Sequence, residues 1–233
     1  MSYPPTPLMN ADAQLRQRNI LGQVYTWMTA GLLVTSAVAA YTATAPFVLN
    51  LLYGNPFTIW LLFLAQIGLV IGLSARIDRL APFTAAALFI AYAALNGLTL
   101  SALFLVYTYT SIAQAFLATA ATFGVMSLYG ATTKRDLSTA GNLLVMALIG
   151  FFIGSIVNLF WANSALYWVL TYLGIALFIG LTAWDTQQIK RMSEQAHDDT
   201  TARRLAIIGA LNLYLDFINL FLLLLRIFGS RDE

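Results

Sequence analysis

The sequence has 233 residues, of which 60% are hydrophobic and only 9% are charged. Soluble domains are about a quarter charged, so this composition excludes an ordinary soluble domain and predicts an integral membrane protein. The net charge is +2 and the basic residues are scattered, which excludes a nucleic-acid-binding surface. The chain contains no cysteine, so disulfides, thiolate catalysis and cysteine-ligated metals are excluded as well.

The first residues are polar and rich in proline, with Pro4, Pro5 and Pro7 followed by Arg16 and Arg18. No short apolar core precedes a small-residue cleavage site, so the segment is not typical of a cleavable signal peptide. We expect residues 1–20 to form a cytosolic tail, residues 21–229 a transmembrane domain and residues 230–233 a short C-terminal tail.

Seven apolar stretches follow one another, each close to the about 20 residues that a helix needs to cross the hydrocarbon core. Lipid offers no partner to unpaired backbone groups, so these stretches must be helices. The expected fold class is therefore an all-α integral membrane protein with seven transmembrane helices. The predicted spans are 22–44, 56–75, 82–106, 112–131, 139–160, 164–187 and 204–228.

The loop charges predict the orientation. All but two of the 12 basic residues lie before the first span or in alternate loops, which places the N-terminus in the cytosol. The two exceptions, Arg226 and Arg231, lie at the opposite end and are partly offset by Asp232 and Glu233. A seventh helix that only partly crosses the membrane would explain these two charges equally well. The ten residues on the predicted cytosolic side are Arg16, Arg18, Arg76, Arg79, Lys134, Arg135, Lys190, Arg191, Arg203 and Arg204.

Two acidic residues lie inside predicted spans, where an ionisable group is costly enough to indicate function. Asp185 is near the inner end of the sixth span, and Asp216 is in the middle of the seventh. The midpoint between them falls in the polar run after the sixth span. If the two spans form a hairpin there, each carboxyl group lies roughly 20 Å from the turn, and the two can face each other.

Two structural alternatives remain open at this point. Asp185 can be an interfacial carboxylate paired with Lys190 or Arg191, and Asp216 can be a core polar group bonded by Asn212 or Asn219.

Two facing carboxyl groups in a low dielectric do not both ionise readily, because desolvation and like-charge repulsion oppose the second charge. Their protons would leave as a coupled pair. Such a pair can sense pH, relay protons or coordinate a hard cation such as calcium. Arg76, at the end of the second span, can snorkel to the interface or pair with Asp185.

Signatures of enzymes are missing: the sequence has no HExxH, GxSxG or glycine-rich phosphate loop. Trp184 and Leu215 precede the two aspartates, where intramembrane aspartyl proteases need Tyr or Gly. We therefore expect no enzymatic activity, no catalytic residues and no cofactor.

Five segments together resemble the Bax inhibitor-1 family of transmembrane proteins, in its bacterial branch. The longest is LNLYLDFINLF (211–221), and the others are WDTQQIK (184–190), GATTKRDLS (130–138), NGLTLSALFLVYT (96–108) and YTWMTAGLLVT (25–35). The resemblance implies a bundle in which the last of seven helices is central. It also implies a bacterial inner-membrane protein similar to the pH-sensitive calcium leak channels of that family.

The resemblance assigns roles residue by residue. Asp185 and Asp216 match the di-aspartyl pH sensor, which is also the candidate calcium-binding pair, and Arg76 matches the latch of the closed state. Trp184 stands where Tyr is more usual, and Ala65 stands at a position that is acidic in the family.

The expected partners are the lipid bilayer and calcium ions. Some bacterial relatives resemble modulators of a membrane-anchored protease, so a regulatory protein that binds such a protease through its N-terminal tail is the alternative function. A proton-coupled transporter is a third class, but no broken-helix or inverted-repeat signal supports it.

Overall fold

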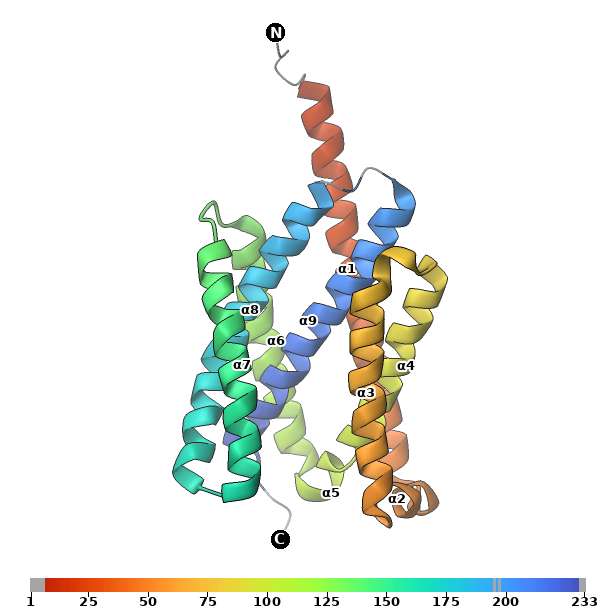
Figure 1. Cartoon of the computed structure of the whole chain (residues 1–233), viewed down its shortest axis with the longest axis vertical. Helices are drawn as coiled ribbons and strands as arrows, with labels where there is room; N and C mark the ends of the chain where they lie inside the picture. Colours follow the sequence, from red (N-terminus) through yellow and green to blue (C-terminus); the bar gives the residue numbers. More distant parts are fainter. Residues whose placement is uncertain (1–6, 195, 197, 231–233) are drawn as a thin grey trace. The chain divides into compact units, whose positions relative to one another are not determined.

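The computed structural model describes residues 7–194, 196 and 198–230, and for residues 7–16 only the path of the helix. This part of the chain is almost entirely helical and contains no β-strand. Seven of its helices are long and apolar enough to cross a membrane, which confirms the predicted all-α, seven-span class. The elements are α1 (Pro7–Ala43), α2 (Pro46–Tyr53), α3 (Pro56–Arg76), η1 (Ile77–Arg79), α4 (Pro82–Leu100), α5 (Leu103–Val106), α6 (Tyr109–Thr132), α7 (Ser138–Trp161), α8 (Ser164–Glu194) and α9 (Asp199–Phe228) (Figure 1).

The N-terminal segment is helical ahead of the first span. Helix α1 begins at Pro7, whereas the apolar stretch that predicts the first span begins near residue 22. Proline is well tolerated at the first position of a helix, and the following Leu, Met, Ala, Gln and Arg residues are good helix formers. Residues 1–6, which belong to the predicted tail, and residues 231–233 at the other end lie outside the described part of the chain.

The chain divides into two compact units, and the division passes through α8 and α9. Unit 1 comprises Met1–Leu105 and Ile189–Leu211, and unit 2 comprises Val106–Gln188 and Asn212–Glu233.

Unit 1 is built around α4, against which both α1 and α3 pack. Proline begins α2, α3 and α4, where its missing N–H would have no helical partner in any case. Helices α1 and α4 approach closely at Gly97, where a Cβ would lie 2.7 Å from the carbonyl oxygen of Thr35. The Thr35 hydroxyl in turn donates a hydrogen bond of 2.8 Å to the carbonyl of Ala93. Small residues and hydroxyl bonds of this kind are the usual means of packing helices in lipid.

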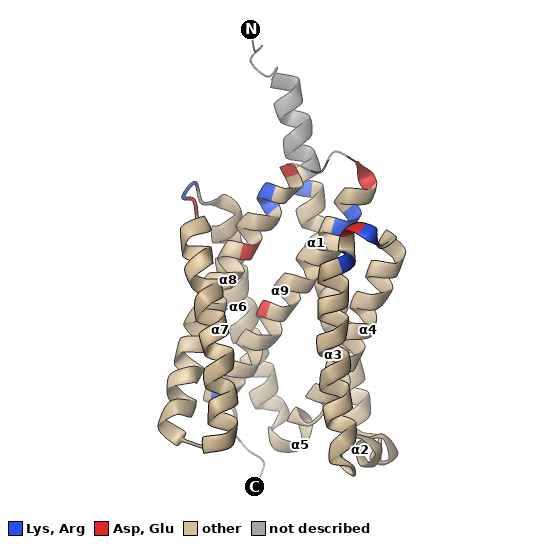
Figure 2. Cartoon of the chain, viewed as in Figure 1, with Lys and Arg blue, Asp and Glu red and all other residues tan. Residues whose placement is uncertain are grey.

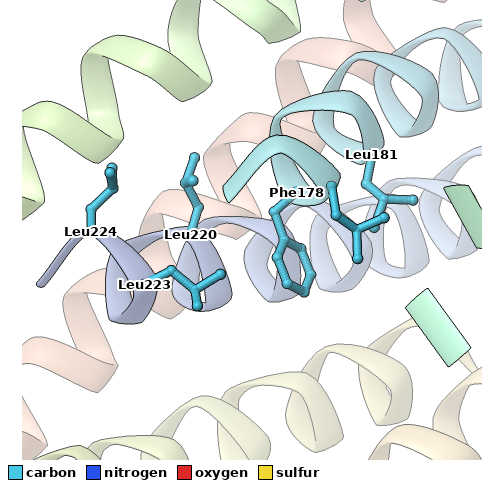
Figure 3. Packing of buried hydrophobic residues seen from close by; sticks show 6 residues of the cluster. Phe178, Leu181, Leu220, Leu223 and Leu224 are labelled. Atoms are coloured by element: carbon cyan, nitrogen blue, oxygen red, sulfur yellow. The ribbon is translucent and has the colours of Figure 1, made fainter. Parts of the chain in front are cut away.

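Unit 2 contains α6, α7 and the parts of α8 and α9 that carry the two aspartates. A cluster of buried apolar side chains joins α8 to α9, and Figure 3 shows residues of this cluster on both helices where the two lie side by side. Its members are Leu177, Phe178, Leu181, Leu220, Leu223 and Leu224. The cluster lies next to the two aspartates in sequence, so it holds together the segments of α8 and α9 that carry them.

The far end of α9 bears on the question of whether the seventh helix crosses completely. The N–H of Ser230 donates to the Ser111 hydroxyl at 3.0 Å, and the N–H of Thr108 donates to the Ser230 carbonyl at 3.3 Å. The end of α9 is therefore tied to the start of α6, whose other end leads into the loop of Lys134 and Arg135. With 30 residues, α9 is about 45 Å long, more than the hydrocarbon core requires. This arrangement favours a complete seventh span over a partial one.

The charge of Arg226 at this end has a partner. Its guanidinium carbon lies 5.0 Å from the centre of the Tyr167 ring, a cation–π contact. Among the candidate spans, α9 is the most buried and α7 the least. The central position of the last helix, which the family resemblance implies, stays a prediction.

Candidate functional site

The segment of α8 that carries Asp185 is held by close contact with α6. Gly130 on α6 faces the Ala183 carbonyl so closely that a Cβ at this position would overlap it. One turn earlier on α6, the hydroxyls of Ser127 and Thr186 hydrogen-bond to each other at 3.0 Å. Thr186 is fully buried, so this bond satisfies two hydroxyl groups that water does not reach.

Two further residues of α8 contact α7 and the loop before it. The indole of Trp184 lies against Gly141, where any side chain would collide with it. The amide of Gln187 accepts a hydrogen bond from the N–H of Leu137 and donates one to the carbonyl of Arg135. The neighbours of Asp185 in the sequence are therefore all held by other elements. Trp184 contacts α7, Thr186 bonds to α6, and Gln187 bonds to the loop between them.

Asp216 lies on α9 in a buried position, with only 4% of its surface exposed. The ring of the next residue, Phe217, packs edge-on against Phe116 and Phe123 of α6, with ring centres 5.4 and 5.5 Å apart. The amide of Asn219 donates to the carbonyl of Leu215 and therefore serves the backbone of its own helix. Of the two amides considered from sequence as partners of Asp216, Asn219 is thus engaged elsewhere.

The structure brings the two aspartates together. The carboxyl groups of Asp185, which is half-buried, and Asp216 hydrogen-bond to each other. The second oxygen of Asp216, Oδ2, is buried and has no hydrogen-bond partner. The two carboxyl groups thus lie beside each other, and one buried oxygen of Asp216 is left unsatisfied.

The hairpin expected from the spacing is present. Helix α8 ends at Glu194 and α9 begins at Asp199, close to the predicted turning point.

Figure 2 shows that most charged residues gather near helix ends and in turns, as expected for helices that cross lipid.

Arg76 is in the last turn of α3, in unit 1, and its side chain is exposed. Asp185 belongs to unit 2, so the pairing of the two side chains stays a prediction.

A resident metal site would need more ligands than the aspartate pair offers. The described residues contain no group of three or more His, Cys, Asp or Glu side chains. Calcium prefers six to eight oxygen ligands, and the two carboxyl groups offer at most four oxygens.

The sequence alone did not identify Gln187, Ser127, Gly130 or Gly141 as residues near the site. All four lie in or beside the quoted segments WDTQQIK and GATTKRDLS, and a polar or small residue facing a neighbouring helix has no periodic signature of its own. A buried glutamine next to a span end is the one signal that could have drawn attention to Gln187.

Comparisons with known proteins place the chain in a family. Residues 17–233 match the family model described as "Inhibitor of apoptosis-promoting Bax1". The chain is 54% identical over 213 residues to an inner membrane protein of Escherichia coli (strain K12), YbhL, covering 91% of each chain. It is 42% identical over 215 residues to an uncharacterised protein of Deinococcus radiodurans, covering 92% of each. An uncharacterised membrane protein of Streptococcus pyogenes serotype M3 (strain ATCC BAA-595 / MGAS315) is 39% identical over 200 residues, which are 84% of this chain and 86% of that protein. The chain belongs to the Bax inhibitor-1 family of membrane proteins.

Proposed function

We propose that this protein is a pH-sensitive leak channel for calcium in the bacterial inner membrane, with its N-terminus in the cytosol. The opening of the channel depends on the protonation of Asp185 and Asp216, and no catalytic step is involved. One observation carries the proposal: two carboxyl groups share a hydrogen bond inside membrane-spanning helices, and a buried oxygen of Asp216 has no partner. A structural role alone would be expected to leave both carboxyl groups fully hydrogen-bonded.

The direction of the pH response follows from the charge on the pair. At low pH both groups are protonated, so the pair offers neither charge nor free carboxylate oxygens to a cation. As the pH rises, the pair first shares one proton and then loses it, and two adjacent negative charges in a low dielectric attract a divalent cation strongly. Calcium flux should therefore increase with pH.

Arg76 is the proposed latch of the closed state. Its guanidinium would compete with the cation for Asp185, because both are positive partners of one carboxylate. In this scheme an arriving calcium ion and Arg76 exclude each other.

The direct test is calcium flux into proteoliposomes over a pH series, with wild type beside Asp185→Asn and Asp216→Asn. We expect flux to rise with pH in wild type and to lose most of this dependence in both variants. Asp199→Asn is the control, because Asp199 is an exposed acid in the first turn of α9. If Asp185→Asn and Asp216→Asn both keep the pH profile of wild type, the aspartate pair is not the pH sensor.

A second candidate function is the regulation of a membrane-anchored protease. The observation in its favour is that α1 begins at Pro7, ahead of the apolar stretch of the first span, so the segment before the membrane is a helix that a partner can bind. Deletion of residues 2–15 separates the two functions. The protease-binding function requires loss of partner regulation with unchanged flux, whereas the channel function requires flux that keeps its dependence on the two aspartates.

A further inference from the structure

Unit 1 contains a cleft between the α3–α4 connection and the helix ends on either side of the α8–α9 turn. Its volume is about 310 Å³, and sites for small molecules usually start at about 300 Å³. One wall is η1 and the other is the beginning of α9, so we call it the η1–α9 cleft. Its apolar lining comes from Ile77, Met192, Leu205 and Ile208, and its polar lining from Asp78, Thr201 and Arg204.

Arg204 is the basic group of the η1–α9 cleft, and its guanidinium is held in place. The side chain is half-buried, and its Nε donates a hydrogen bond of 2.7 Å to the carbonyl of Leu80. In the described part of the chain this is the one hydrogen bond of Arg204, so the two terminal amino groups of the guanidinium can donate to a ligand. The planar guanidinium matches the oxygens of a phosphate group especially well.

Asp78 is the acidic group of the cleft and lies on the η1 wall, whereas Arg204 lies on the α9 wall. Among the residues that the structure describes, no ion pair joins the two side chains. Asp198 is also near, but its carboxylate accepts the hydroxyl and the N–H of Thr201. These hydrogen bonds lower the pKa of Asp198 more than the charge of Arg204 does. The cleft therefore presents one positive and one negative group that do not neutralise each other.

The cleft lies where two spans end. The candidate spans of α3 and α9 end at Arg79 and begin at Asp199, so Asp78 and Arg204 are at the level of phospholipid headgroups. Leu205 and Ile208 continue the lining toward the apolar part of α9. A pocket between membrane helices with a charged rim at this level is typical of a site for a lipid headgroup.

The two charges select the kind of headgroup. A phosphate can bind Arg204, and a positive group on the same molecule can bind Asp78. A primary ammonium has N–H donors for the carboxylate, whereas a trimethylammonium group has none and is usually recognised by aromatic rings. The lining of the cleft contains no aromatic side chain. The matching headgroup is therefore zwitterionic, with a phosphate and a primary ammonium.

We propose that the η1–α9 cleft binds one phospholipid of the phosphatidylethanolamine class. The phosphate is bound by Arg204, the ammonium by Asp78, and the first part of an acyl chain lies against Leu205 and Ile208. The bound lipid connects η1 to the beginning of α9, two segments that the bond between Arg204 and Leu80 already joins. This inference does not depend on the channel function proposed above, because it concerns other residues and a different ligand.

The test measures lipid binding to the purified full chain after removal of its native lipids. Phosphatidylethanolamine, phosphatidylglycerol and phosphatidylcholine with identical acyl chains are added separately, and native mass spectrometry counts the lipids that stay bound. We expect one tightly bound phosphatidylethanolamine per chain. Its affinity should exceed that of the other two lipids by about fivefold, which is the effect of one ion pair at an exposed carboxylate. Equal affinities for the three lipids would overturn the proposal.

Asp78→Asn is the decisive variant, because it removes the partner of the ammonium and the charge that repels an anionic lipid. Phosphatidylethanolamine and phosphatidylglycerol should then bind about equally. Asp199→Asn is the matched control, since Asp199 is an exposed acid of unit 1 outside the cleft lining, and it should keep the wild-type preference. A wild-type preference in Asp78→Asn contradicts the assignment of Asp78.

Arg204→Gln tests the phosphate contact. It should weaken all three lipids by a similar factor, whereas Arg203→Gln, at an exposed arginine outside the lining, should leave the affinities unchanged. Equal affinities in these two variants would contradict the role of Arg204. If Arg204→Gln fails to fold, Asp78→Asn decides the outcome, because Asp78 is exposed.

Glycerophosphoethanolamine, the same headgroup without acyl chains, distinguishes a lipid from a soluble zwitterion. The melting temperature of the protein should rise with phosphatidylethanolamine and stay unchanged with an equal concentration of glycerophosphoethanolamine. An equal rise with both compounds would mean that the apolar lining does not contribute, and the occupant would then be a soluble molecule instead of a lipid.

Discussion

Both units contain buried polar side chains that bond across helices, but unit 2 also contains a pair of carboxyl groups with an unsatisfied oxygen. In unit 1, Gln66 of α3 donates to the Leu95 carbonyl at 2.9 Å and to the Thr99 hydroxyl at 2.7 Å, and Thr35 of α1 donates to Ala93. Each of these bonds links two helices. In unit 2, the carboxyl groups of Asp185 and Asp216 bond to each other, and the Oδ2 atom of Asp216 remains without a partner.

This difference distinguishes polar side chains that only stabilise helix packing from polar side chains whose charge can change. An amide or hydroxyl bonded to a backbone carbonyl contributes modestly to helix packing and has no charge to lose. An acid with an unsatisfied buried oxygen destabilises the fold unless it is protonated or meets a cation. Unit 1 therefore contains polar groups that hold helices together, whereas unit 2 contains a pair whose state can change.

The largest expected effect comes from separating α6 from α8 in unit 2. Gly130→Val places a side chain against the Ala183 carbonyl, and we expect a loss of stability of about 3 kcal/mol together with loss of flux. Thermal unfolding in detergent and calcium flux measure the two effects. Gly124→Val is the matched control on the same helix, because a Cβ there meets no atom within 4 Å. Equal behaviour of the two variants would contradict the close contact on which the site depends.

Substitutions of Gln66 and of Asp216 test this difference between the two units. Gln66→Met should lower stability by about 1 kcal/mol through the loss of its interhelical hydrogen bonds, with an unchanged pH profile of flux. Asp216→Asn should leave the stability equal to or above that of wild type but make the pH profile of calcium flux flat. If Gln66→Met changes the pH profile of calcium flux as strongly as Asp216→Asn does, the distinction between the units is wrong.

A smaller effect is expected at the start of α9, in unit 1. The hydroxyl and backbone N–H of Thr201 donate to Asp198 and lower the pKa of that carboxyl group. Because the pKa is lower in the folded state, the stabilisation is present at neutral pH and is lost as the pH falls below the ordinary aspartate range. Asp198→Asn retains a capping side chain but has no charge to titrate. The acid-induced fall in melting temperature should therefore be slightly shallower in this variant than in wild type, and an identical fall would contradict the assignment.

The smallest expected effect is that of calcium removal. Two carboxyl groups are too few to hold calcium tightly, so a chelator should leave the melting temperature of the purified protein unchanged at neutral pH. Magnesium added in place of calcium serves as the control. A clear drop in melting temperature on chelation would indicate a resident calcium site instead of a permeation pathway.

Much of the fold could be predicted because lipid leaves few options. Seven apolar stretches longer than the hydrocarbon core must be helices, and the observed spans begin and end within a few residues of most predicted ones. The largest difference is at α1, because the helix formers after Pro7 extend it beyond the apolar stretch that alone marks a span. Sequence spacing also placed Asp185 and Asp216 at one depth, since a hairpin makes equal distances from the turn equal heights.

The sequence alone determined the family, the seven apolar spans and the two acids within them, because hydropathy and charge act along the chain and need no neighbour. Only the tertiary structure decided that the two carboxyl groups meet, that one oxygen of Asp216 is left unsatisfied, and that Gln187 is bonded to the loop behind Asp185. These features depend on how each helix is rotated about its axis. That rotation is set by contacts such as those of Gly130 with Ala183 and Trp184 with Gly141, which join residues far apart in the chain.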